Sequence, residues 1–301
     1  MGTADLHIND TCALCPPVYR RELDAEHRPG HLIMQIWVAW KEFWQIIADK
    51  RTDLENQLIR EIQKTRKVGK REAREEAQGL LRVVHIVDGD ACDMNTHETT
   101  QLISTNRVDV QRALIDVFDP VMAVVDDTFI IRGTAAHTGP NGELEEWFAQ
   151  DIGAIACPDD DCVSWWKLKN IFSGVRVFAA HHSPTGTKLD NKKNQSAARA
   201  AERVAVSYMR LGMSRRPNLV LFAHRHYPAF GDELGVRCRY LPSWKLVGAF
   251  GHRLAATNAE PIGGWWGVLR GGKIIEEPRD DEGLGPFELW RLPSVDKWHE
   301  L

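Results

Sequence analysis

Long apolar segments are missing from this sequence of 301 residues: no run approaches the ~20 apolar residues that a membrane-spanning helix needs. The first residues, Met1 to Asp5, also lack the basic stretch and apolar core of a secretory signal. The formal net charge is only −4 at pH 7, which by itself indicates neither nucleic acid nor a membrane as a partner. Internal repeats and low-complexity linkers are absent too. We therefore expect a globular protein of the cytoplasm that binds no membrane.

Cysteine is sparse, with six residues in the chain. Cys12 and Cys15 form a Cys-x-x-Cys pair, and Cys157 and Cys162 form a second, wider pair. The four thiolates could jointly bind a structural zinc ion. The simpler interpretation is that all six cysteines are reduced thiols of a cytosolic enzyme.

Histidine and tryptophan are abundant instead, with twelve and eleven residues. Hydrophobic residues make up 43% of the chain and charged residues 27%, which is ordinary for a soluble globular protein. A chain of this length can bury a sizeable core. We predict a single domain over residues 1–301, with a helical insertion at about residues 31–80.

The predicted insertion has apolar residues at intervals of three and four from Ile33 to Ile47, the pattern of an amphipathic helix. Its tryptophans are expected to pack on the core, with a second subunit as the alternative, and the oligomeric state stays open. A second helical pattern begins at Thr52, and a bend at 49–52 or 68–69 would produce a hairpin. Residues 64–74 are basic with interleaved glutamates, so they form either a phosphate-contacting surface or a solvated helix face held by salt bridges.

Apolar segments after the insertion alternate with helical patterns, which predicts an α/β fold. Further helices are expected at 108–125, 143–155 and 194–211. The expected strands are 82–87, 128–132, 175–180, 219–223, 237–241, 265–269, 273–276 and 287–292. Ligands bind at the carboxyl ends of strands in such sheets, so the residues that follow each strand are the candidates for a site.

Acidic residues and histidines follow the apolar strands. The clearest case is the buried-strand pattern from Leu219 to Ala223, which runs directly into His224 and His226. Neutral imidazole is a common metal ligand, but one His-x-His pair is weak support for a metal site. Five such clusters occur in the chain: Asp5 with His7, Asp90 with Asp93, His137, His181 with His182, and His224 with His226. This mixed nitrogen and oxygen set exceeds one tetrahedral site and suits two metal ions that share a carboxylate.

The order of these clusters resembles the calcineurin-like metallophosphoesterases, whose motifs run D-x-H, G-D-x-x-D, G-N-H, H and G-H-x-H. The corresponding blocks here are Asp5-Leu6-His7, Gly89-Asp90-Ala91-Cys92-Asp93, Gly133-Thr134-Ala135-Ala136-His137, His182 and Ala223-His224-Arg225-His226. The block that ends at His137 and the tryptophan-rich helical segment are similar to phage-type members. The resemblance implies an α/β fold with a central two-sheet β-sandwich flanked by helices. It also implies a dinuclear metal centre that activates water to hydrolyse phosphomono- or diesters.

The resemblance implies two divalent metal ions, with Mn²⁺ as the first choice and Fe, Zn or Ni as alternatives. The implied ligands are Asp5, His7, Asp90, His182, His224 and His226. Asp90 would bridge the ions. His182 is preferred to its neighbour His181 because it stands two residues before Pro184. Candidate substrates are nucleotides or nucleic acid, either DNA or RNA. A phage-encoded member would act in the host cytoplasm.

The remaining roles fall on four residues. His137 would protonate the leaving group as a catalytic acid or would instead be a metal ligand, and Asp93 would orient a ligand imidazole. Arg225 and Thr134 are candidates for contact with the substrate phosphate, with a solvent-facing position as the alternative for Arg225. Thr134 replaces the family's asparagine ligand, His137 stands two residues later than the family's histidine, and almost no strand precedes Asp5. A non-catalytic binding or scaffold protein with a decayed metal site is therefore the main alternative, followed by a mononuclear metallohydrolase.

Overall fold

The structure is a computed structural model that describes residues 1–22, 25–94, 101–139, 142–155, 166–184, 193–212, 216–246 and 261–277. Two sequence interpretations lie outside the described residues: the second cysteine pair, Cys157 and Cys162, and the predicted strand at 287–292. Across the described ranges, no helix combines the length and the apolar character that spanning a membrane requires.

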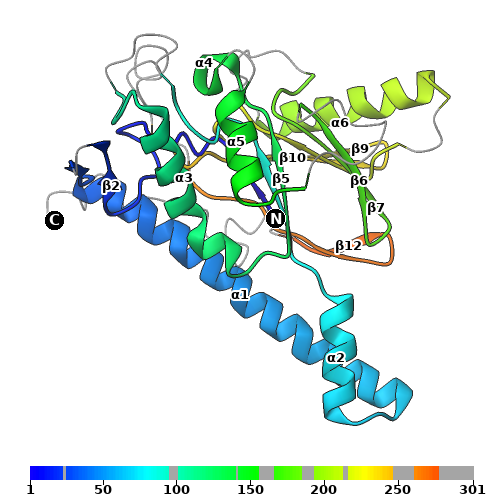
Figure 1. The fold of residues 1–301 in the computed structure, drawn as a ribbon. Helices are drawn as coiled ribbons and strands as arrows, with labels where there is room; N and C mark the ends of the chain where they lie inside the picture. The colour runs from blue at the N-terminus through cyan, green and yellow to red at the C-terminus, as the bar shows by residue number, and fades with distance from the viewer. Residues whose placement is uncertain are drawn as a thin grey trace, which may run out of the picture.

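The helices and strands alternate through the middle of the chain as predicted (Figure 1). The helices are α1 (His31–Arg66), α2 (Lys70–Leu80), α3 (Arg107–Met122), α4 (Ala135–Thr138), α5 (Glu143–Asp151) and α6 (Lys193–Arg210). The strands are β1 (Gly2–Thr3), β2 (Tyr19–Arg20), β3 (Glu26–His27), β4 (Val84–Asp88), β5 (Asp127–Ile131), β6 (Leu168–Phe172), β7 (Val175–Ala180), β8 (Leu219–Phe222), β9 (Ala229–Glu233), β10 (Val236–Tyr240), β11 (Val268–Arg270) and β12 (Lys273–Glu276).

Two sheets carry the strands that lead to the predicted clusters. The first has the order β1-β4-β5 and is parallel. The second has the order β6-β7-β8-β10-β9, with β7, β8 and β10 parallel and the two edge strands antiparallel. One hydrophobic cluster includes residues of both sheets, such as Ile86 and Phe129 from the first and Val177 and Leu221 from the second. The protein is therefore a mixed α/β structure with several sheets.

The first strand, β1, is short but long enough to fix the position of the Asp5–His7 segment. Only Gly2 and Thr3 pair with β4, yet the backbone stays beside the loop that follows β4: the Asp5 N–H donates to the Gly89 carbonyl at 3.0 Å and the His7 N–H to the Asp90 carbonyl at 2.9 Å. Both Asp5 and His7 are fully buried. The few residues before Asp5 thus anchor this segment without a full-length strand.

The helical segment forms a hairpin whose two ends pack differently. The bend lies at Val68 and Gly69, the second of the two predicted positions, because α1 continues unbroken to Arg66. Near its start, Trp40 and Trp44 are buried in the main core, as predicted, and the Trp40 Nε1–H donates to the Val117 carbonyl at 2.9 Å. Burial of this kind is typically worth about 3–5 kcal/mol for each tryptophan. The apolar residues of the far end of α1 pack on α2, and Glu61 forms an exposed ion pair with Arg270 of β11 at 2.6 Å. Beyond this pair the hairpin projects from the body of the molecule (Figure 1).

Candidate metal centre

The loops after β1, β4, β5, β7 and β8 meet at one edge of the two sheets. Parallel strands end on the same side of a sheet, so the residues after them converge. Backbone hydrogen bonds join neighbouring loops, for example from the Ala223 N–H to the His181 carbonyl at 3.2 Å. All five predicted clusters come together here. The order of strands and the residues at their ends therefore build one polar site from five distant parts of the chain.

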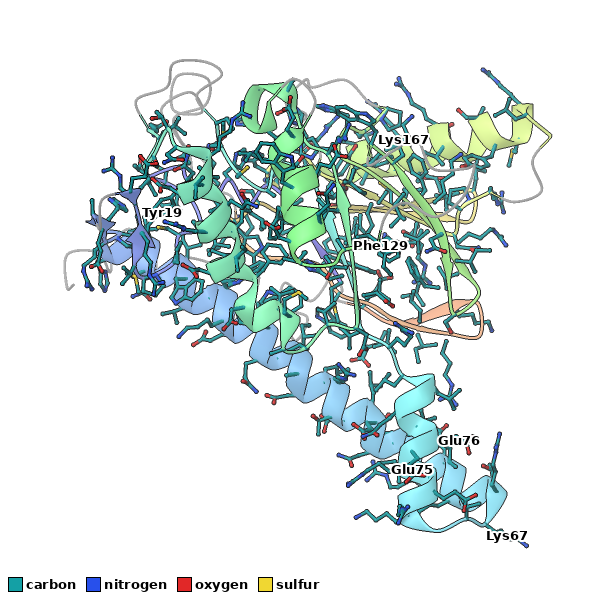
Figure 2. All side chains as sticks on the ribbon, in the orientation of Figure 1. Tyr19, Lys67, Glu75, Glu76, Phe129 and Lys167 are labelled. Carbon is teal, nitrogen blue, oxygen red and sulfur yellow. The ribbon has the colours of Figure 1, made fainter. Side chains whose placement is uncertain are left out.

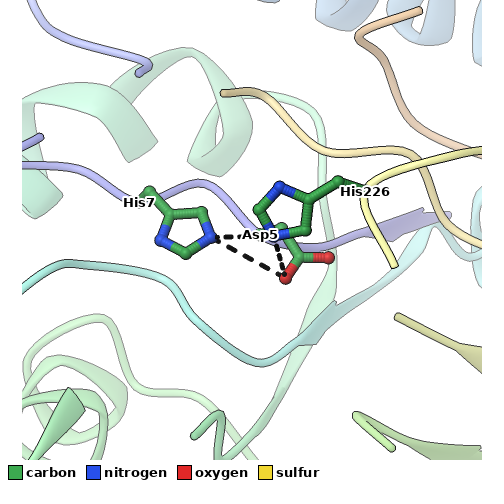
Figure 3. A group of neighbouring side chains, drawn as sticks. All are labelled: Asp5, His7 and His226. Atoms are coloured by element: carbon green, nitrogen blue, oxygen red, sulfur yellow. Dashed lines mark hydrogen bonds and ion pairs between the residues drawn. The ribbon is translucent and has the colours of Figure 1, made fainter. Parts of the chain in front are cut away.

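Asp5, His7 and His226 form the first group of potential metal ligands (Figure 3). The Nε2 atoms of His7 and His226 lie 3.2 Å apart, and Asp5 Oδ1 lies 3.4 Å from His226 Nε2 and 3.9 Å from His7 Nε2. Two neutral imidazoles at this distance share at most one proton. The group therefore points ring lone pairs and a carboxylate oxygen at one place, an arrangement that suits a cation.

Asp90, His181 and His224 form the second group. The Nε2 of His181 lies 3.0 Å from Asp90 Oδ2, and its Nδ1 lies 2.6 Å from the Asp88 carbonyl oxygen. A ring nitrogen that donates to a carbonyl fixes the tautomer, so Nε2 faces the site. The two groups adjoin, because Asp5 Oδ1 lies 3.9 Å from His181 Nε2 and Asp5 Oδ2 accepts the His224 N–H at 3.0 Å.

The histidine pair after β7 divides differently from the sequence interpretation. His182, the preferred ligand, is exposed, and its ring lies edge-on to that of His224 at 4.4 Å between centroids. Within the described residues, the groups of potential ligands contain His181 and not His182. The Asp88 carbonyl accepts from His181 Nδ1, which turns the Nε2 of that ring toward Asp90. The His182 ring instead packs edge-on against the rings of His181 and His224.

Asp93 lies behind the two groups and contacts one predicted metal ligand, His7, and the predicted catalytic acid, His137. Its Oδ2 accepts from His7 Nδ1 at 3.1 Å, and its Oδ1 accepts from His137 Nδ1. Burial would raise the pKa of the Asp93 carboxyl, but the imidazoles of His7 and His137 and the ammonium of Lys245 hold that pKa well below its usual range. Asp93 is thus an anion that fixes the orientation of two imidazoles.

Lys245 was missed by the sequence analysis. It follows no motif and comes from the segment after β10, yet its Nζ lies 3.1 Å from Asp93 Oδ2 and 2.6 Å from Asp10 Oδ2. Only tertiary structure brings these three residues together. Two carboxylates beside one largely buried ammonium raise the pKa of Lys245, although burial alone would lower it. The lysine therefore stays charged and supports Asp93 from behind.

Thr134 contacts Asp90 instead of standing apart as a ligand. The backbone N–H of Thr134 donates to Asp90 Oδ1 at 2.6 Å, and its hydroxyl lies 3.1 and 3.2 Å from the two carboxylate oxygens. The preceding Gly133 allows this approach, because a Cβ there would lie 2.0 Å from Asp90 Oδ1. Thr134 thus holds Asp90 in place, and its expected contact with a substrate phosphate stays a prediction.

Glu145 joins the loops after β4 and β5. Its buried carboxylate accepts from the Ala91 N–H at 3.0 Å and from the Gly133 N–H at 2.8 Å. Burial raises the pKa of Glu145 to about 7. No sequence pattern signals this bridge between loops, because the donors are backbone N–H groups that almost any residue carries.

Arg225 is engaged away from the two groups. Its guanidinium donates to the hydroxyls of Ser196 and Tyr227 at 2.9 Å, and lies over the ring of Tyr240 at 5.0 Å. It also lies 3.3 Å from the Ser183 hydroxyl. These contacts tie the last loop to α6 and β10. These contacts do not test the predicted contact of Arg225 with a substrate phosphate, which stays a prediction.

Backbone strain is concentrated at the site. Nine described residues other than glycine have positive φ, a conformation that costs an L-residue roughly 1–3 kcal/mol. Five of the nine belong to the two groups: Asp5, His7, Asp90, His224 and His226, with φ between 48° and 66°. Strain that recurs in the residues of one cluster is typical of functional sites, where the surrounding structure forces side chains into a required geometry.

Comparison with known proteins adds little to this geometry. No family model and no curated protein match the chain. Among solved structures, a single mutant of Vps29 from Entamoeba histolytica is 7% identical, with a TM-score of 0.33 over 62% of this chain and 69% of that chain. The hypothetical protein PH1004 from Pyrococcus horikoshii OT3 is 13% identical, with a TM-score of 0.32 over 57% of this chain and 69% of that chain. Likenesses this weak say nothing about activity, so the site is interpreted from its own residues.

Proposed function

We propose that this chain is a metal-dependent phosphoesterase, built on a two-sheet β-sandwich, that hydrolyses phosphomono- or diesters. The observation that supports the proposal most directly is the pair of adjoining ligand groups, Asp5-His7-His226 and Asp90-His181-His224. Their order along the chain follows the motif order of the metallophosphoesterases. Two groups with a carboxylate between them match a centre for two divalent ions, an arrangement that stabilises both the attacking and the leaving oxygen in phosphoester hydrolysis.

The burial and the chemical type of the ligand atoms give a second reason to expect divalent cations. Asp5 Oδ1 is completely buried and, within the described part of the chain, receives no hydrogen bond; the Nε2 of His226 is close but is not aligned to donate. An unpaired buried carboxylate oxygen costs several kcal/mol unless a cation or donor offsets it. Imidazole nitrogen and carboxylate oxygen together suit Mn²⁺, Fe, Zn or Ni. Asp5, His7 and His226 would hold one ion, His181 and His224 the other, with Asp90 shared.

Bound divalent ions would supply positive charge at the phosphoryl oxygens and make water more acidic. The chain's own residues supply orientation and a proton. Asp93 accepts from His137 Nδ1. Burial alone would lower the pKa of His137, but the hydrogen bond to Asp93 and the nearby charge of Asp90 raise it, which favours the imidazolium form, whose Nε2 also carries a proton. The His137 side chain is 31% exposed, so a substrate can reach it. When the bond from phosphorus to the leaving oxygen breaks, the proton on Nε2 passes to that oxygen, a contribution of about 10²–10⁴-fold in rate.

The test is phosphoester hydrolysis by protein that has been stripped of metal and then loaded with Mn²⁺. Bis-p-nitrophenyl phosphate, p-nitrophenyl phosphate and single-stranded DNA serve as a diester, a monoester and a polymer. Loss of turnover in Asp90→Asn, with turnover retained in the exposed control Asp53→Asn, is the expected result. Turnover of the monoester alone would remove nucleic acid from the candidate substrates.

A non-catalytic binding protein on the same fold is the second candidate, because Thr134 donates to Asp90 where the family has an asparagine ligand. Calorimetric titration with Mn²⁺ separates the two. Substoichiometric binding together with no turnover of either small substrate would favour the binding protein. Two bound ions with turnover would favour the enzyme.

A further inference from the structure

The hairpin of α1 and α2 ends in an exposed basic tip, defined here as residues 64–71. The outer part of the hairpin is held by a small cluster of its own, Ile59, Ile62, Ala73 and Ala77, with Leu58 and Val68 against it. Lys67 lies at the far end of the projection (Figure 2). The hairpin therefore carries the tip away from the body and buries little surface in doing so.

The basic tip has five cations and no acidic residue within eight positions, in a chain whose formal net charge is −4. All five side chains are on exposed residues: Lys64, Arg66, Lys67, Lys70 and Arg71. Acidic residues resume only at Glu72, Glu75 and Glu76 on α2. The positive charge of the hairpin is thus gathered at its end.

Internal pairing leaves much of this charge available. Arg66 pairs with Glu76 and Arg71 with Glu75, each at 3.1 Å, and both pairs are exposed, so they are weak and easily exchanged for another anion. Within the described ranges, Lys64, Lys67 and Lys70 form no ion pair. A solvated face held by salt bridges, one of the two interpretations of this segment, accounts for only the two arginines.

Helix stability explains only part of the charge. Lys64 and Arg66 stand in the last turn of α1, where the helix dipole favours cations. Lys70 and Arg71 stand in the first turn of α2, where the dipole disfavours cations, and Gly69 before them supplies no side-chain cap. These two cations therefore weaken α2, which points to a role outside the fold.

We propose that the basic tip binds the phosphate backbone of nucleic acid. Several separated cations on an exposed projection suit a repeating polyanion, because each can neutralise a different phosphate. A membrane surface fits less well, since Val68 is the sole apolar residue of the tip and it is half-buried. None of the tip residues belongs to the two ligand groups. Binding of nucleic acid by the tip is therefore independent of the proposed hydrolysis. If the protein both binds nucleic acid at the tip and hydrolyses it at the metal centre, the tip is a second contact with the substrate.

The experiment measures binding of a fluorescently labelled DNA duplex by anisotropy, in EDTA so that no turnover occurs, over a series of salt concentrations. The test variant combines Lys64→Gln, Lys67→Gln, Lys70→Gln and Arg71→Gln, and glutamine keeps a good helix propensity. The slope of log K against log salt should become less negative by about 3 units, and affinity at roughly 0.1 M salt should fall by about tenfold or more.

A matched control removes four exposed cations elsewhere, with Arg20→Gln, Arg21→Gln, Arg28→Gln and Lys41→Gln. The control should keep both the slope and the affinity of the wild type. Equal losses in both variants, or an unchanged slope in the test variant, would overturn the proposal. Tip-dependent binding to vesicles of anionic lipid without binding to the duplex would overturn it in favour of a membrane surface. If the protein hydrolyses no phosphoester but binds the duplex through the tip, the proposed function fails and the binding proposal is supported.

Discussion

Lys245 Nζ lies 3.1 Å from Asp93 Oδ2, the same oxygen that accepts from the Nδ1 of His7. An ammonium and an imidazole thus share one carboxylate oxygen, while the other oxygen holds His137. The position of a ligand imidazole and that of the proposed proton donor therefore both depend on Asp93, and Asp93 depends on Lys245 and Asp10 behind it.

Removal of the Lys245 charge should reduce both metal binding and turnover. In Lys245→Met, Asp93 loses one donor and His7 loses a fixed partner, so Mn²⁺ affinity or kcat should fall by about 10–100-fold, as for other residues that orient a ligand. Lys245→Arg keeps the charge and should recover part of the loss. Calorimetric titration and the kinetics of diester hydrolysis measure the two effects. Equal losses in the Met and Arg variants, with an unchanged affinity for metal, would contradict this role.

Glu145→Gln should loosen the two loops that Glu145 joins. The carboxylate accepts two backbone N–H groups, but the amide of glutamine presents only one acceptor oxygen, so one of Ala91 or Gly133 loses its partner at a cost of about 1–3 kcal/mol. Urea unfolding of metal-free protein at acidic and neutral pH measures the cost.

The contribution of Glu145 to the free energy of unfolding should also change with pH, and the sign of this change follows from its pKa. Burial raises the pKa of Glu145 to about 7 from its ordinary value of 4.5, so the native state holds its proton more tightly than the unfolded state does. Stability from this group is therefore present below the unfolded pKa and is lost as pH rises towards 7. The wild type should lose stability relative to Glu145→Gln over that interval. A difference between the two proteins that stays constant with pH would refute the assignment.

Gly133→Ala should prevent the close contact between the loops after β4 and β5. The added Cβ would lie 2.0 Å from Asp90 Oδ1 and 2.1 Å from the Asp90 backbone nitrogen, and the backbone cannot yield as a flexible side chain can. We expect loss of metal binding and a clear drop in the thermal midpoint. Gly79→Ala on α2 is the control, because a Cβ there meets no atom within 4 Å and alanine should stabilise the helix by about 0.5–1 kcal/mol. Similar behaviour of the two variants would show that the contact is unimportant.

Most of the fold could be predicted from patterns of apolar residues. The helical periodicity from Ile33 onward and the apolar runs before Asp90 and His224 gave elements whose boundaries agree with the structure to within a few residues. The position of the hairpin bend was open, since both candidate positions contain residues that disfavour a helix. A left-handed Lys67 ends α1 and decides between them.

The candidate site was predictable as a set of clusters but not in its supporting contacts. The apolar run directly before His224 predicts that His224 and His226 lie at the carboxyl end of a strand, and this prediction needs no other part of the sequence. The contacts of Lys245 and Glu145 depend on tertiary structure and on backbone amides, which leave no pattern in the sequence. The choice between His181 and His182 depends on one carbonyl, that of Asp88, which turns one ring inward.

That choice gives the last prediction. His181 lies 3.0 Å from Asp90 Oδ2 in the second ligand group, whereas His182 is exposed beside His224. His181→Ala should therefore lose the second Mn²⁺ ion and keep the first, which Asp5, His7 and His226 would hold with Asp90. His182→Ala should bind both ions with unchanged stoichiometry. Calorimetric titration with Mn²⁺ counts the ions in each variant, and far-ultraviolet circular dichroism checks that each is folded. Loss of an ion in His182→Ala, with both retained in His181→Ala, would return the ligand role to His182 and show that the loop after β7 rearranges around the metal.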